Sequence, residues 1–327
     1  METVYVVIPY FQREQGILQK ALQSVAAQQH SAWHVIVADD ESPISAESEL
    51  AGLSNIPKSR ITIVAGRNGG PAVARNRGLA AVPANGKYVA FLDSDDTWSP
   101  DHLSNALATL NQGYDLYFAD HLQFGARDTA FLRAGRITPS QHPSIEGHSL
   151  HEYSGDLFHQ TLTGNVIGTS TVVYRVDKFR DVRFQEAFTY AGEDYLFWME
   201  LQVKGARAAF SDGCEAIYGR GVNVFASSGW GTEKSLDRIV DEIAFNKSLP
   251  EMFELSDEQR RFVRNRLSRV RRNLAMDILH RFRHKKIIKR ELLRKLFEID
   301  KPSLIFLLPN ILIESASARL TKRSFDL

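Results

Sequence analysis

Short apolar runs alternate with helical patterns over the first hundred residues of the chain. The runs are rich in β-branched and aromatic residues, which is typical of buried strands. They cover residues 4–8, 34–38, 60–64 and 88–92. Residues 14–28 repeat apolar positions at helical spacing, and residues 71–82 begin with Pro71, which suits the first turn of a helix. Strands and helices joined by short links predict an α/β sheet with parallel strands. We expect the first strand to stop at Pro9.

The second half of the chain is first rich in loops and then helical. Residues 126–162 contain little periodicity. The elements expected after them are a strand at 166–175, a helix opening at Glu193, basic amphipathic helices at 260–282 and 285–297, and an apolar segment at 303–313. The patterns predict an α/β region over residues 1–225 and a basic, amphipathic helical region over residues 226–327.

Composition narrows the class of protein. The chain has 327 residues, of which 43% are hydrophobic and 24% charged, as in ordinary globular proteins with a substantial core. Cys214 is the single cysteine, so no intrachain disulfide can form, and a cytosolic setting is expected. The first residues lack a basic segment before the apolar run, so we expect no signal peptide. No apolar run reaches about 18 residues, so we expect no membrane-spanning segment.

The net charge of +1 hides a strong asymmetry. Residues 260–295 hold 15 Lys and Arg against Asp277 and Glu291, which gives +13. Residues 296–327 hold four charges of each sign, which leaves −12 for residues 1–259. A basic tail of this density favours contact with phosphate groups, either of an anionic membrane or of nucleic acid. Its aromatic residues do not form stacking platforms, so nucleic acid is the weaker alternative. The helices could instead pack on the α/β region or pair two copies as a homodimer.

Polar segments follow the predicted strands at their carboxyl ends. These segments are Pro9–Glu14, Asp39–Asp40, Arg67–Arg75 and Asp93–Asp96. Each alone is readily explained as a polar loop or a helix cap. Ligands of open α/β sheets bind at the carboxyl ends of the strands, so four such segments together predict a binding site.

Asp93 and Asp95 are the chemically most specific pair. They stand at an i, i+2 spacing just after a buried strand, and an extended segment would point both carboxylates the same way. Hard oxygen ligands of this kind suit Mg²⁺ or Mn²⁺ shared with substrate phosphates. The alternative is a polar turn that caps the next helix.

Two helix starts add further candidates. The segment Asn68–Gly78 leads into a helix N-terminus, which favours anions, and Arg75 could add a planar fork of donors for phosphate. The segment matches neither a Walker motif nor a dinucleotide fingerprint. Asp194 lies in the first turn of another predicted helix, where an ionised carboxylate could act as a general base. Helix capping is the alternative for Asp194.

Taken together, these segments resemble the family 2 glycosyltransferases with the GT-A fold, and among them enzymes of bacterial exopolysaccharide assembly of the succinoglycan type. The resemblance spans residues 3–205 and rests on six segments in order. They are VVIPYFQRE, LQKALQSVAAQ, VIVADDES, NGGPAVARNRG, YVAFLDSDDTWSPDHL, and GTSTVVYR followed by AGEDYLFWMEL. It implies a GT-A catalytic domain over residues 1–225, with a nucleotide-binding half, 1–125, and an acceptor half, 126–225.

The resemblance also implies an activity and a set of site residues. It implies inversion at the anomeric carbon, a divalent metal ion and a nucleotide-sugar donor, usually UDP-linked, with UDP-glucose as the default. Asp194 would be the catalytic base, and Asp95 with Asp93 would bind the metal ion. The nucleotide would contact Pro9, Phe11, Glu14, Asp40, Arg75, Asp93 and Ser94. Many relatives extend glycans on polyprenyl diphosphate, so we expect a glycan or lipid-linked glycan acceptor and peripheral attachment of residues 260–313 to the cytoplasmic leaflet.

The chain departs from the family pattern at three places. Phe11-Gln12 stands where Tyr-Asn is usual, and Glu41 stands where glycine usually follows the Asp pair. A Gln-x-x-Arg-Trp segment is absent, so we expect one sugar to be added per acceptor. Two other functions fit the α/β sheet and its acids: a sugar nucleotidyltransferase and a non-catalytic scaffold of a polysaccharide assembly complex. The first would release pyrophosphate, but its usual glycine-rich segment is missing after the first strand.

Overall fold

A computed structural model of the chain describes residues 1–53, 56–145, 149–222 and 228–312. It divides into two compact units, which are described separately. Unit 1 consists of Met1–Glu186 and Glu193–Val222, and unit 2 consists of Ala187–Gly192 and Asn223–Leu327. Within the described residues, no helix is both long enough and apolar enough to cross a membrane.

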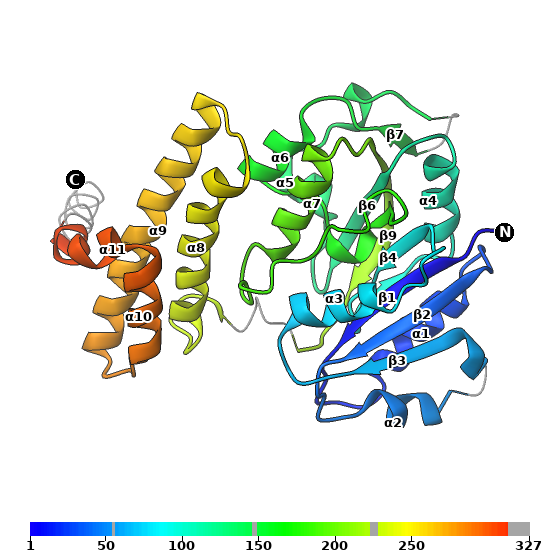
Figure 1. The fold of residues 1–327 in the computed structure, drawn as a ribbon, viewed down its shortest axis with the longest axis horizontal. Helices are drawn as coiled ribbons and strands as arrows, with labels where there is room; N and C mark the ends of the chain where they lie inside the picture. The colour runs from blue at the N-terminus through cyan, green and yellow to red at the C-terminus, as the bar shows by residue number, and fades with distance from the viewer. Residues whose placement is uncertain (54–55, 146–148, 223–227, 313–327) are drawn as a thin grey trace. The chain divides into compact units, whose positions relative to one another are not determined.

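Unit 1 is built on one mixed sheet (Figure 1). Its strands are β1 (Val4–Tyr10), β2 (Trp33–Asp39), β3 (Ile61–Ala65), β4 (Tyr88–Phe91), β5 (Thr97–Trp98), β6 (Leu116–Gln123), β7 (Leu150–Glu152), β8 (Val173–Arg175) and β9 (Ala208–Tyr218). In the described residues these nine strands follow the order β3-β2-β1-β4-β8-β6-β9-β5, and β7 pairs with β9. Strands β3, β2, β1 and β4 are mutually parallel, and β8 runs antiparallel to β4 and β6.

Helices cover both faces of this sheet. The α-helices of unit 1 are α1 (Ile17–Ala26), α2 (Ala46–Ala51), α3 (Pro71–Ala80), α4 (His102–Leu110), α5 (Ala130–Ala134), α6 (Leu157–Thr163) and α7 (Glu193–Val203), with 3₁₀ turns η1 (Lys58–Arg60), η2 (Pro139–Gln141) and η3 (Thr169–Thr171). Helices α1 and α4 pack on one face, and α3 and α7 pack on the other. Burial on both faces explains why the strands read as continuous apolar runs. The predicted α/β sheet and its first four strands are confirmed.

Two details of the predicted strands are wrong. Strand β1 continues through Pro9 to Tyr10 and pairs with β2 over its full length. The pairing of β1 with β4 ends at Val7. Proline has no backbone N–H, and Pro9 therefore interrupts no hydrogen bond between β1 and β4. The expected strand at 166–175 is reduced to β8, because Thr171 Oγ1 donates to the carbonyl of Gly168 at 2.8 Å and favours the 3₁₀ turn η3.

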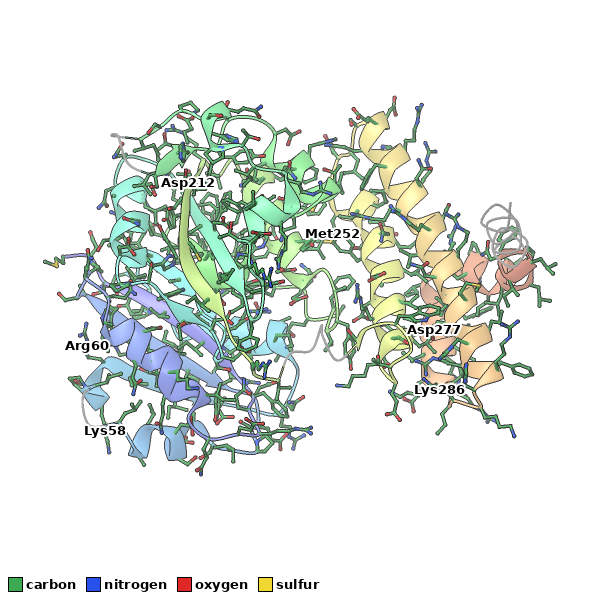
Figure 2. The ribbon with its side chains drawn as sticks, turned by 180° about the vertical axis from the view of Figure 1, so that it is seen from behind. Lys58, Arg60, Asp212, Met252, Asp277 and Lys286 are labelled. Atoms are coloured by element: carbon green, nitrogen blue, oxygen red, sulfur yellow. The ribbon has the colours of Figure 1, made fainter. Side chains whose placement is uncertain are left out.

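Unit 2 is helical, as the sequence predicts. It contains α8 (Ser235–Met252), α9 (Asp257–Arg283), α10 (Arg290–Ile299) and α11 (Lys301–Ile305) around an apolar core of its own. Asp277 is fully buried at the centre of a polar network (Figure 2), in which it accepts hydrogen bonds from Ser235 Oγ and Arg281 Nε, both at 2.5 Å. The α10 helix starts five residues later than expected, since Lys285 takes a positive φ of 52° that ends the preceding helix.

Glu41 has a left-handed backbone with φ 60°, which explains why glycine is the usual residue at this position. Its exposed side chain accepts a hydrogen bond from Asn68 N at 3.2 Å. The chain therefore retains local strain at the loop after β2.

Replacing Glu41 by glycine should relieve this strain, whereas alanine keeps the β-carbon and loses the same carboxylate. We expect Glu41→Gly to be more stable than Glu41→Ala by about 1 kcal/mol in urea unfolding. A glycine variant less stable than the alanine variant would contradict the strain at this position.

Candidate active site

Gln12 joins several chain segments at the carboxyl ends of β1, β2 and β4. Its side chain is buried, and Nε2 donates to Ser94 Oγ at 3.0 Å. Its Oε1 accepts from Val222 N at 3.1 Å, and its backbone N donates to Ser42 Oγ at 2.8 Å. These bonds tie the end of β1 to the loops that follow β2, β4 and β9. The departure Phe11-Gln12 thus supplies a side chain long enough to bridge these loops.

Arg75 brings together acidic residues from two segments that are far apart in sequence. The guanidinium lies 2.8 Å from Asp93 Oδ1 and 3.4 Å from Glu193 Oε1, and the residue is 4% exposed. Burial opposes the charge of Arg75, but the carboxylates of Asp93, Glu193 and Asp194 raise its pKa and keep it cationic. The structure therefore gathers the predicted residues Arg75, Asp93 and Asp194 in one cluster, with Glu193 added.

The Asp93–Asp96 segment is a hydrogen-bonded turn, so the expectation of an extended segment is wrong. Asp96 N donates to the carbonyl of Asp93 at 3.0 Å. Asp95 Oδ2 accepts from Gly221 N at 2.7 Å, and burial together with repulsion from Asp93 raises the pKa of Asp95. The same causes raise the pKa of Asp96 well above its ordinary value. Three carboxylates are crowded into four residues, and the turn would gain from a nearby positive charge.

The donor set fits a divalent cation. Carboxylate oxygens are the ligands that Mg²⁺ and Mn²⁺ prefer, and such ions in phosphate sites are held by one or two carboxylates plus phosphate oxygens. Asp93 and Asp95 would supply these carboxylates. In the part of the chain that the structure describes, no three His, Cys, Asp or Glu side chains are grouped to hold a metal ion by themselves. A cation bound here would share its coordination with the diphosphate of a ligand.

Two glycines after β9 allow its loop to close over this turn. A β-carbon at Gly219 would overlap the backbone carbonyl of Asp95, and one at Gly221 would overlap the side chains of Asp95 and Gln12. The close approach lets Gly219 N donate to Asp96 Oδ1 at 2.9 Å and Gly221 N donate to Asp95. Both positions therefore require glycine.

Glu193 and Asp194 form the first turn of α7, as predicted for Asp194. Burial, with repulsion from Asp194, raises the pKa of Glu193 to about 8. Burial also raises the pKa of Asp194, while Arg75 and the hydrogen bond from Tyr195 N at 2.8 Å oppose that rise. The two carboxyls therefore share a buried site in which burial favours their protonated forms and Arg75 favours their ionised forms.

The two aspartates at the carboxyl end of β2 have different environments. Asp39 accepts from Ser42 N and Ala46 N, both at 2.8 Å, and so shapes the loop into α2. Asp40 is 2% exposed and accepts from Gly70 N at 2.8 Å and from Gly69 N at 3.1 Å. Asp40 thereby fixes the loop that begins the helix carrying Arg75.

The remaining predicted residues lie along the same edge of the sheet. Pro9 and Phe11 are half-buried at the end of β1, Ser94 is buried against Gln12, and Glu14 is exposed on the loop before α1. Gln12 and Asp96 fall within the predicted polar segments but were given no individual role, and Ser170, Glu193 and the two glycines were not predicted as parts of the site. Asp96 and Glu193 adjoin predicted residues, which is a signal that could have found them.

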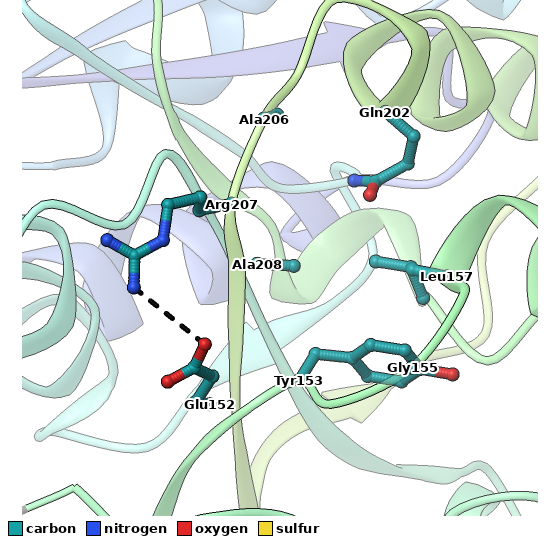
Figure 3. A pocket seen from close by; sticks show the side chains of 8 residues that line it. All are labelled: Glu152, Tyr153, Gly155, Leu157, Gln202, Ala206, Arg207 and Ala208. Carbon is teal, nitrogen blue, oxygen red and sulfur yellow. Dashed lines mark ion pairs between the residues drawn. The ribbon is translucent and has the colours of Figure 1, made fainter.

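A small cavity lies at the other end of β9 (Figure 3). Its volume is about 130 Å³, and Glu152 and Arg207 form an ion pair of 3.8 Å at its edge. It is lined by Glu152, Tyr153, Gly155, Leu157, Gln202, Ala206, Arg207 and Ala208. None of the predicted site residues lines it, and it adjoins the amino end of β9, whereas the acidic cluster adjoins the carboxyl end.

Sequence comparison relates the chain to enzymes that transfer sugars. The family described as "Glycosyl transferase family 2" matches residues 5–183. The succinoglycan biosynthesis protein ExoW of Rhizobium meliloti (strain 1021) is 38% identical over 240 residues, which cover 69% of this chain and 72% of that protein. The GalNAc(5)-diNAcBac-PP-undecaprenol beta-1,3-glucosyltransferase of Campylobacter jejuni is 28% identical over 205 residues, which cover 62% of this chain and 60% of that enzyme.

Solved structures share the fold. TarS 1-349 of S. aureus, in complex with UDP-GlcNAc, superposes with a TM-score of 0.59 at 17% identity, over 99% of this chain and 92% of that one. The mannosyltransferase PcManGT of Pyrobaculum calidifontis, in complex with GDP-Man and Mn²⁺, gives a TM-score of 0.54 at 15% identity, over 97% of this chain and 86% of that one. The predicted GT-A fold with a helical C-terminal extension is confirmed.

The family match covers more than half of the chain, and the similarity to ExoW extends over more than two thirds of it. These matches favour sugar transfer over the two alternatives of a nucleotidyltransferase and a non-catalytic scaffold. The chain belongs to glycosyltransferase family 2 and is a glycosyltransferase.

Proposed function

We propose that the chain transfers one sugar, with inversion, from a UDP-linked donor to a glycan acceptor carried on polyprenyl diphosphate, in bacterial polysaccharide biosynthesis. The observation that carries the proposal is the cluster of Arg75 with Asp93, Glu193 and Asp194, which lie up to 119 residues apart in sequence. The names of ExoW and of the Campylobacter glucosyltransferase support the pathway and the lipid-linked acceptor. The UDP-GlcNAc complex of TarS supports a UDP-linked donor, and UDP-glucose is the first donor to test.

The donor would lie across the carboxyl ends of β1, β2 and β4. Pro9, Phe11, Glu14 and Asp40 would contact the nucleoside, and Asp93, Ser94 and Arg75 would lie near the diphosphate. A divalent ion held by Asp95 and Asp93 would neutralise the charge that develops on the leaving diphosphate. The permanent charge and planar donors of Arg75 suit the same task from within the protein.

Asp194 is the proposed general base. Its carboxylate would accept the proton of the acceptor hydroxyl while the hydroxyl oxygen bonds to the anomeric carbon and the bond from that carbon to the diphosphate oxygen breaks. Attack from the face opposite the leaving group inverts the anomeric configuration. Arg75 and the hydrogen bond from Tyr195 N favour the ionised form of Asp194 that this role requires.

Changing Asp194 to Asn should lower turnover at least about a hundredfold, because general base catalysis contributes roughly 10²–10⁴ in rate. The affinity for UDP should stay within about twofold, since the amide keeps the shape of the carboxylate. Turnover is measured as UDP release with a polyprenyl-diphosphate glycan acceptor, and UDP affinity is measured by calorimetry. Asp212→Asn, an exposed aspartate of β9, is the matched control. Near-normal turnover of Asp194→Asn would remove Asp194 from the role.

The stability of the protein should depend on pH through Glu193. Its folded-state pKa of about 8 lies above the ordinary value of 4.5, so between these values the folded state binds the proton more tightly. This contribution to stability is therefore present at low pH and is lost as the pH rises towards 8. Glu193→Gln should lose less stability between pH 5 and pH 8 in urea unfolding. The exposed Glu14→Gln is the control, and equal pH dependence of both variants would refute the shift.

We also propose that unit 2 attaches to an anionic membrane surface through its basic helices, residues 260–313, of which Ile313 lies outside the described residues. The turn between α9 and α10 supports this. Phe282 and Ile287 are 81% and 82% exposed there. Exposed basic residues flank them, namely Arg283, Lys285, Lys289 and Arg290. Each Lys or Arg near an anionic surface contributes about 1 kcal/mol of attraction, and exposed apolar side chains can enter the interface.

Phosphatidylglycerol vesicles should bind the protein in co-sedimentation, and salt should weaken the binding. Replacing Phe282 and Ile287 by Ser should lower the affinity about tenfold or more, because apolar burial is lost. Leu132 of unit 1 is 70% exposed, and the control variant Leu132→Ser should leave the affinity for the vesicles unchanged. Equal binding of both variants, or concentration-dependent dimerisation through this turn without vesicle binding, would contradict membrane attachment.

A further inference from the structure

Ser170 contacts both ends of the Asp93–Asp96 turn from a distant segment of the chain. It lies in η3 and is completely buried. Its Oγ donates to Asp96 Oδ2 at 2.5 Å and accepts from Asp93 N at 3.0 Å, across 74 and 77 residues of sequence. A single hydroxyl therefore sets the separation between the first and the last aspartate of the turn.

The backbone of Ser170 is fixed as well. Its carbonyl accepts from Trp98 Nε1 at 2.5 Å. The indole of Trp98 packs against the tilted ring of His102 with ring centroids 4.6 Å apart, and His102 Nδ1 lies 2.8 Å from Glu215 Oε2. His102 is fully buried and Glu215 is 3% exposed. Ser170 is thus anchored to a rigid part of the core and not only to the turn that it contacts.

The hydrogen bonds divide the three aspartates into two kinds. Asp96 is 3% exposed, and its two oxygens accept from Ser170 Oγ and Gly219 N. The side chain of Asp93 is 33% exposed, and Asp95 has one bond from Gly221 N. Asp96 is therefore occupied by the protein, and Asp93 and Asp95 retain free lone pairs for a ligand.

We propose that Ser170 is a positioning residue that holds Asp93 and Asp95 in the geometry that binds a divalent cation. The inference rests on the proposed function, since it concerns the cation site assigned to those two residues. Without the hydroxyl, Asp96 would lose one of its donors, and repulsion among the three carboxylates would displace the turn. Residues that orient the ligands of a metal ion typically change its affinity 10–100-fold.

Thr171 offers a matched control in the same 3₁₀ turn. It is also completely buried, but its Oγ1 donates locally to the carbonyl of Gly168 at 2.8 Å, and among the described residues it forms no hydrogen bond with the three aspartates. Ser170→Ala and Thr171→Val each remove one buried hydroxyl. Both variants should lower the unfolding midpoint, and a purely structural role for Ser170 would make them alike in every other respect.

The test is Mn²⁺ binding to the full chain with saturating UDP, measured by electron paramagnetic resonance of the free ion. Ser170→Ala should weaken Mn²⁺ affinity about 10–100-fold, and Thr171→Val should stay within about twofold of the wild type. Asp95→Asn is the reference for loss of a ligand. Circular dichroism and the unfolding midpoint report on folding. Trp98→Phe keeps an aromatic ring but removes the hydrogen bond to the Ser170 carbonyl. It should also weaken Mn²⁺ affinity, and it replaces Ser170→Ala as the test variant if Ser170→Ala does not fold.

The outcomes separate this inference from the proposed function. If the wild type binds Mn²⁺ and both Ser170→Ala and Trp98→Phe bind it equally well, Ser170 is purely structural and the inference is overturned alone. If the wild type does not bind Mn²⁺ with UDP, the proposed cation site fails and the inference fails with it.

Discussion

The crowding of negative charge in the Asp93–Asp96 turn is the constraint on which the rest of the site depends. Three carboxylates within four residues repel one another, and burial adds to the cost of their charges. The fold offsets this with Arg75 on one side and with donors from Ser170, Gly219 and Gly221 on the other. Those donors come from segments far away in sequence, so the charges of the turn are offset only when these segments have come together. A site that concentrates charge in this way is prepared for a cationic or cation-bound ligand.

Arg75 links this turn to the proposed base. Because its guanidinium bonds to Asp93 and Glu193 at once, the position of the first turn of α7 is tied to the position of the aspartates after β4. The loop that leads into the helix of Arg75 is in turn held by Asp40. Donor binding and proton transfer would therefore depend on one connected set of buried ion pairs and hydrogen bonds. Removing any one side chain of this set would cost free energy, because its buried partners would lose their hydrogen bonds.

The sequence predicted the parts of the fold that local pattern controls. Apolar runs identified β1 to β4, the acids at their ends identified Asp40, Asp93 and Asp95 as candidates, and a predicted helix start identified Asp194. It could not predict Ser170 or the closure by Gly219 and Gly221, because their roles arise from contacts across 74 to 126 residues. The predicted strand at 166–175 was too long, because the Thr171 hydroxyl bonds to the local backbone and favours a 3₁₀ turn there. Pattern shows which residues lie at a strand end, whereas hydrogen-bond partners are decided by tertiary packing.

The proposed function depends most on a cation-assisted site for a nucleotide sugar in unit 1. A thermal-shift panel of UDP, GDP and CDP sugars, each with and without Mn²⁺, tests it most directly, since a ligand that binds the folded state raises its unfolding temperature. UDP sugars should raise the unfolding temperature, and Mn²⁺ should enlarge that rise. Stabilisation by none of these sugar nucleotides, or equal shifts with and without the ion, would contradict it.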